Sequence, residues 1–140
     1  MTVKISTNKF MRNLRQATER GLVRATEAVR TEAVRLVNNP PKTGEVYTKR
    51  GGVTHQASAP GEAPAGDTGN LAKLITTTYD FSNMVGIVDS AADYSAFLEF
   101  GTKNMEARPF MRPALANMRS QIPNLLTAEV RGIFGGGILK

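Results

Sequence analysis

The chain has 140 residues, a formal net charge of +6 and an isoelectric point near 10.0. This length suits one domain with its own core, so we expect a single domain over residues 1–140. The absence of cysteine excludes disulfide frameworks, thiolate nucleophiles and cysteine-based zinc sites. No apolar run approaches the roughly 20 residues of a membrane helix, so we expect a soluble protein, made in a cytoplasm, with no membrane partner.

A long helix is predicted at about residues 7–37. Apolar and small residues recur there at three- and four-residue steps on one side, which is the period of an amphipathic helix. Ser6 or Thr7 is the expected N-cap. Pro40 and Pro41 end the pattern because proline has no backbone N–H to donate. The middle of the apolar stripe is small, which favours close packing within the chain over packing between subunits: Ala17, Gly21, Ala25 and Ala28.

Residues 38–70 are rich in Pro, Gly, Thr and Ser, and we expect a flexible arm or loop there. Gly51 and Gly52 stand between two β-prone segments, which predicts a two-residue hairpin turn with a basic tip. Such an arm would become ordered when it docks on a partner. Its candidate contact residues are Tyr47, Lys49, Arg50 and His55.

Two antiparallel strands are predicted next, at about 74–81 and 84–90. Both segments are rich in Thr, Val, Ile, Tyr and Phe, and Ser82–Asn83 joins them. Asp67–Thr68 resembles a helix cap and predicts a helical turn before the first strand.

Two further helices are expected after the strands. A short one spans about 93–100, with Asp93 as its cap. A C-terminal helix spans about 113–134, and Pro123 should kink or restart it. Residues 135–140 form a glycine tail to which the sequence assigns no role.

The stretch YSAFLEFGTKNMEARPFMRPAL, residues 94–115, has an architectural composition. Gly101 permits a left-handed turn after the short helix. Glu99 and Arg108 have opposite charges and are expected to pair across this turn. Prolines bracket Phe110, which we expect to fill the protein's own core rather than a neighbour's pocket.

The sequence offers little for catalysis, so we expect no catalytic residue, no cofactor and no metal. His55 is the only histidine, and the glycine-rich segments lack the pattern of a P-loop or a dinucleotide fold. The acidic residues that a metal-dependent nuclease would need have simpler roles as caps or in ion pairs; they are Asp89, Asp93, Glu99 and Glu106.

Three features in order resemble the tail-completion proteins of long-tailed bacteriophages, which join heads to tails and are minor tail components. These features are the N-terminal helix ending at Pro40–Pro41, HQASAPGEAPAGDTGNL at 55–71, and YSAFLEFGT with ARPFMRPAL at 94–115. The positions that match the family signature, and that the resemblance implies to be structural, are Tyr94, Glu99, Phe100, Gly101, Thr102, Arg108, Pro109, Phe110 and Pro113.

The resemblance implies an α+β fold with an antiparallel β-sheet packed against the long N-terminal helix and a C-terminal helix, from which the hairpin arm would protrude. It implies a non-enzymatic virion protein of the neck, in a ring expected to be sixfold. Its partners would be copies of itself, the tail terminator and head-completion or stopper proteins. Two alternatives stay open: a tail terminator ring, and a basic accessory protein that contacts DNA nonspecifically.

Overall fold

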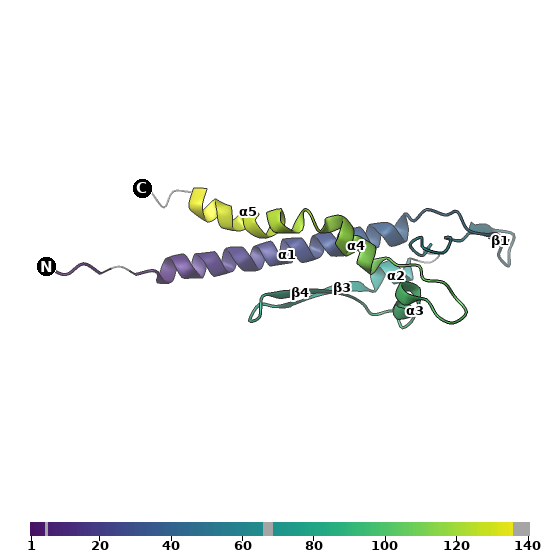
Figure 1. Cartoon of the computed structure of the whole chain (residues 1–140), viewed down its shortest axis with the longest axis horizontal. Coiled ribbons are helices and arrows are strands. Elements are labelled where there is room, and N and C mark those ends of the chain that lie inside the picture. The colour runs from purple at the N-terminus through teal and green to yellow at the C-terminus, as the bar shows by residue number, and fades with distance from the viewer. Residues whose placement is uncertain (5, 66–68, 136–140) are drawn as a thin grey trace.

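A computed structural model describes residues 1–4, 6–65 and 69–135. The molecule is elongated along helix α1 (Asn8–Asn38), which runs through its middle (Figure 1). Helix α5 (Ile122–Gly135) lies along one side of α1, and a two-stranded sheet lies along another. This mixed α+β architecture agrees with the expected fold class.

Helix α1 confirms the prediction from the apolar period to within a residue at each end. Thr7 occupies the N-cap position, although its side chain makes no capping hydrogen bond. The small stripe lets α5 approach closely: a Cβ placed on Gly21 would lie 2.5 Å from the carbonyl oxygen of Leu126. At the far end of the pair, the rings of Phe10 and Phe134 meet edge to face with centroids 5.8 Å apart. The small residues therefore serve packing within the chain, as expected.

The predicted pair of strands is present as β3 (Ile75–Asp80) and β4 (Val85–Ser90). They pair antiparallel in a register that runs from Ile75 opposite Ser90 to Asp80 opposite Val85. One face of this sheet packs on α1. Gly86 is needed there because the side chain of Thr26 occupies the space of a Cβ.

The connecting helices are short. They are α2 (Asn70–Lys73), α3 (Ser95–Phe100) and α4 (Met111–Met118). The predicted C-terminal helix is interrupted between α4 and α5, and Pro123 is the second residue of α5, so the expected restart is confirmed. The prediction that Asp93 caps α3 is wrong, since Tyr94 holds the N-cap position without a side-chain hydrogen bond. The predicted cap at Asp67–Thr68 and the tail after Gly135 lie outside the described residues.

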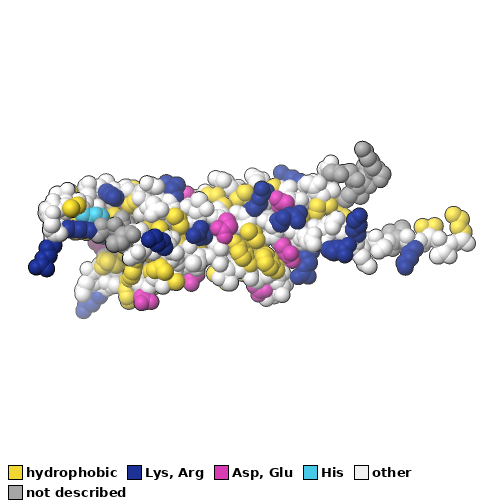
Figure 2. Space-filling model, turned by 180° about the vertical axis from the view of Figure 1, so that it is seen from behind, with side chains coloured by type: hydrophobic (Ala, Val, Ile, Leu, Met, Phe, Trp, Pro, Cys, Tyr) yellow, Lys and Arg dark blue, Asp and Glu magenta, His cyan; other side chains and the backbone are white. Residues whose placement is uncertain are grey.

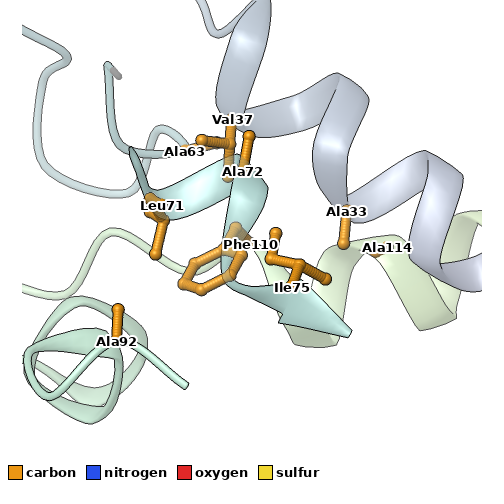
Figure 3. Close-up of a cluster of buried hydrophobic side chains, with 9 residues drawn as sticks. All are labelled: Ala33, Val37, Ala63, Leu71, Ala72, Ile75, Ala92, Phe110 and Ala114. Atoms are coloured by element: carbon orange, nitrogen blue, oxygen red, sulfur yellow. The ribbon is translucent and has the colours of Figure 1, made fainter. Parts of the chain in front are cut away.

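The main apolar cluster lies toward one end of the molecule, where the last turns of α1 meet α2, the start of β3 and the start of α4 (Figure 3). Phe110 is fully buried in it, so the prediction that this side chain fills the protein's own core is confirmed. The buried members are Ala33, Val37, Ala63, Leu71, Ala72, Ile75, Ala92, Phe110 and Ala114.

A hairpin arm extends from the same end (Figure 1). Strands β1 (Val46–Thr48) and β2 (Thr54–Gln56) pair antiparallel. The turn is longer than predicted: the N–H of Lys49 donates to the carbonyl of Val53, so three residues form the loop rather than two. Both glycines of this loop have positive φ, which accounts for their presence.

Candidate assembly site: the Glu99 turn and the β1–β2 arm

Glu99 is the centre of the turn between α3 and α4. Its carboxylate is buried, at 6% exposure, and accepts hydrogen bonds from the backbone N–H groups of Phe110, Met111 and Arg112 at 2.9 to 3.0 Å. These donors belong to the N-terminus of α4, where a helix has N–H groups without partners inside the helix. A carboxylate from one helix therefore caps the next one, which fixes the chain on both sides of Phe110.

The same contacts keep Glu99 ionised. Burial alone would raise the pKa of this carboxyl, but the N–H groups of Phe110, Arg112 and Met111 favour the charged form and hold the pKa below its usual range. The positive end of the α4 dipole acts in the same direction. Glu99 is thus a structural anion rather than a proton donor.

The predicted ion pair between Glu99 and Arg108 is wrong, because Arg112 takes that place. Arg112 Nε lies 3.2 Å from a carboxylate oxygen of Glu99, and its guanidinium sits 4.7 Å from the centre of the Phe100 ring. Arg112 is the residue whose side chain returns to Glu99 from the first turn of α4, while Arg108 precedes Pro109 and points toward another loop.

Gly101 makes the tight return after α3 possible. Its φ of 75° is positive, as the predicted left-handed turn requires, but its ψ of 178° lies outside the left-handed helical region; its N–H donates to the carbonyl of Phe97. A Cβ here would lie 2.8 Å from the carbonyl oxygen of Met105 and 2.9 Å from the nitrogen of Ala107. Thr102 closes the turn by donating its N–H to Met105.

Two of the segments that carry the family resemblance meet in space here. The N–H of Gly61 donates to the carbonyl of Ala107, and Arg108 reaches the hydroxyl of the buried Ser58 at 3.4 Å. Ser58 and Ala63 belong to the segment at 55–71, and Arg108 to the one at 94–115. The turn around Glu99 therefore also anchors the chain that leads away from the arm.

The other signature positions divide between buried and exposed surroundings. Pro109 and Pro113 are half-buried beside Phe110. Tyr94 and Phe100 are exposed, at 45% and 69%, together with Phe97 at 55%. The signature thus builds a buried cap and also presents an aromatic surface on α3.

The arm brings together the predicted contact residues Tyr47 and His55, which are paired across the strands with ring centres 5.2 Å apart. Arg50 lies exposed in the turn, next to Lys49. Val46 and Val53 are 63% and 66% exposed, so the arm buries little apolar surface. Two backbone hydrogen bonds close the base of the arm: the N–H of Gly44 donates to the carbonyl of Ala57, and the N–H of Ala57 donates to the carbonyl of Glu45.

The positive charge of α1 is interleaved with carboxylates. Figure 2 shows Lys and Arg side chains along the whole length of one face, with Asp and Glu among them. Five α1 arginines form ion pairs: Arg15 with Glu19, Arg20 and Arg24 with Glu129, Arg30 with Glu27, and Arg35 with Glu32. Arg35, and then Asn117, lower the pKa of Glu32 to about 2. Arg20 and Arg24 therefore tie α1 to α5, and the other three arginines are paired within α1.

The carboxylates considered for metal binding have different surroundings. Glu99 is committed to backbone donors, whereas Asp89 and Asp93 are exposed at the end of β4 and before α3. Within residues 1–4, 6–65 and 69–135, no group of three His, Cys, Asp or Glu side chains is placed to hold a metal ion. In the same ranges, no helix is long and apolar enough to cross a membrane.

Sequence reasoning missed Arg112 and Ser58. The i to i+13 spacing between Glu99 and Arg112 gives no local signal, and Arg108 competes for the same assignment. Ser58 is 1% exposed and receives the N–H of Ala65 at 3.3 Å, a role that a loop composition rich in Ala and Pro conceals.

Comparison with known proteins gives no assignment: no family model, no curated protein and no solved structure matches the chain.

Proposed function

We propose that this chain is a structural protein of the neck of a long-tailed bacteriophage or prophage, where it completes the tail and joins it to the DNA-filled head. The observation that carries the proposal is the contrast between the Glu99 turn and the arm. Among the signature residues of the resemblance, Glu99 and Phe110 form a buried cap that is hydrogen-bonded to the start of α4, while an exposed basic hairpin projects from the end that this cap stabilises.

An assembly role suits this division. A subunit that must join at one place needs a rigid body and a segment that gains its contacts only on docking. The arm has the second property, since its strands are three residues long and its two valines, Val46 at the base and Val53 next to the tip, are both exposed. A two-stranded hairpin of this size is marginal by itself. Contact with neighbouring subunits or neck proteins would stabilise it.

The proposal includes a ring, expected to be sixfold, in the virion. Ring formation requires a surface on one subunit that binds a different surface on the next one. The arm at one end and the exposed aromatic surface of α3 are two such different surfaces on this molecule.

The test is electron microscopy of lysates from the phage that encodes the chain, with the gene removed. We expect DNA-filled heads beside finished, separate tails, and joining restored by the wild-type gene. Overlong tails would instead identify a tail terminator, and normal virions would contradict a role in the neck.

A further inference from the structure

We propose that a second copy of the chain inserts its β1–β2 arm beside β4, so that β2 of one subunit pairs antiparallel with β4 of the next. The inference rests on the proposed function only in taking copies of the chain as partners. It names the two surfaces that meet and the order of strands in the joined sheet, which becomes β3, β4, β2 and β1.

The free edge of β4 is the first observation. In the described part of the chain β4 pairs with β3 alone, so its other edge has backbone N–H and C=O groups without a strand partner. Such an edge is a template for strand addition. Helix α1 extends under this edge. Its residue Thr26 contacts Gly86 of β4, and Leu22 and Val29 lie about one helical turn to either side of Thr26.

The second observation is an apolar groove along that edge. It has a volume of about 390 Å³, with Gly86 and Val88 of β4 on one side and Leu115 of α4 and Ile122 of α5 on the other. Leu115 in this lining is 52% exposed although it is large and apolar, and Ile87, on the opposite face of β4, is 48% exposed. Apolar surface of this kind is stabilised when a partner covers it.

The groove continues past the end of β4 into a second hollow of about 370 Å³, and Met111 and Arg112 line both. The second hollow carries two exposed carboxylates, Asp89 and Asp93. Its one cationic neighbour in the lining, Arg112, is already bound to Glu99. The groove is therefore apolar along β4 and acidic where β4 ends.

The arm matches the acidic end of this groove. Its tip carries the exposed Arg50 next to Lys49, and Val53, which is 66% exposed, lies directly before β2. With the tip at Asp89, β2 runs opposite to β4, which is the more favourable antiparallel pairing. The arm extends away from the body and from its own β4 (Figure 1), and the segments on both sides of its base are held together by hydrogen bonds from Thr43 and Ala59 to Glu62.

The test is cross-linking of purified, full-length single-cysteine variants, which the cysteine-free sequence makes unambiguous. Val53→Cys and Ile87→Cys are mixed at high protein concentration and treated with a short bis-maleimide. We expect a cross-linked dimer that contains one of each. Met11→Cys, which is 56% exposed on α1, replaces Val53→Cys in the matched control and should give no product above background.

Charge reversal gives the second readout. Arg50→Glu in the Val53→Cys chain should lower the yield several-fold, and Asp89→Lys with Asp93→Lys in the Ile87→Cys chain should restore it. No dimer, an equal yield with Met11→Cys, or no response to the reversals would overturn the inference. Because the assay needs no virion, its failure leaves the result of the gene-deletion experiment standing, and the reverse also holds.

Discussion

The Glu99 turn and the β1–β2 arm are neighbours in the fold but opposite in construction. In the turn, one carboxylate holds three backbone N–H groups and an arginine, and a fully buried phenylalanine lies beside it. In the arm, six strand residues pair through their backbone and bury almost nothing. The free energy of unfolding should therefore depend on the turn, and contacts with partners should depend on the arm.

The largest expected effect on stability is at Phe110. Phe110→Asp would place an unpaired charge in the apolar cluster, which should cost about 4 kcal/mol or more of the free energy of unfolding. Such a loss is a large fraction of the stability of a domain of this size. Urea denaturation followed by circular dichroism measures it.

Phe97→Asp is the matched control, since this ring is already 55% exposed. It should change the free energy of unfolding by less than about 1 kcal/mol. A soluble Phe110→Asp protein as stable as this control would contradict the position of Phe110 in the core.

The second effect is at Glu99. Glu99→Gln keeps the size of the side chain but removes the charge that three N–H groups and Arg112 bind, and hydrogen bonds to charged groups contribute about 1.5–3 kcal/mol. We expect a loss of about 2 kcal/mol, measured by urea denaturation at neutral pH. An equal stability of the two proteins would show that the carboxylate charge is not needed.

The pH dependence of that difference sharpens the test. The pKa of Glu99 is lower in the folded protein than its ordinary value of 4.5, so its contribution is present above pH 4.5 and is lost as the pH falls through the folded pKa. The free energies of wild type and Glu99→Gln should therefore converge in acid. Taking the difference removes the common contributions of other carboxyls with lowered pKa values, such as Glu32 and Asp80.

The sequence predicted local features well and long-range partners poorly. The helix at 7–37, both strands and the restart at Pro123 follow from periodicity and from proline, which act over a few residues. The small stripe around Gly21 correctly predicted close packing, without showing that α5 is the partner. The pairing of Glu99 with Arg112 instead of Arg108 depends on where α4 begins, and a charge pattern does not encode that.

Candidate surfaces were still harder to predict than partners within the fold. The groove beside β4 is built by four separate elements, so none of its apolar residues stands out in the sequence. The arm was predictable because glycines mark its turn, although the hydrogen bond between Lys49 and Val53 lengthens the loop by one residue. The sequence therefore predicted the contact residues of the arm, but it did not predict the surface beside β4 to which we propose they bind.

A smaller effect is expected at the contact of α1 with α5. Gly21→Ala gains about 1 kcal/mol of helix propensity, but the new Cβ would lie 2.5 Å from the carbonyl oxygen of Leu126 and must push α5 away. Overpacking typically costs about 1–3 kcal/mol, so we expect a net loss near 1 kcal/mol by thermal or urea denaturation.

Gly132→Ala is the control for that substitution, because it lies in α5 with nothing within 4 Å of the new Cβ. Here the propensity gain should appear alone and raise stability by up to about 1 kcal/mol. If both substitutions stabilise the protein, α1 and α5 do not approach each other as closely at Gly21 as the structure shows.

The smallest effect on stability, and the largest on assembly, is expected from removal of the arm. Residues 46–56 are replaced by Gly-Gly between Glu45 and Ala57, whose backbone groups are already hydrogen-bonded. Since the removed strands bury little, the free energy of unfolding should change by less than about 1 kcal/mol. The same deletion in the phage should abolish joining of heads to tails. If the deletion protein is stable and still supports joining, the arm is not needed for assembly. If the deletion protein is unfolded, the arm is needed for the stability of the fold, as the Glu99 turn is.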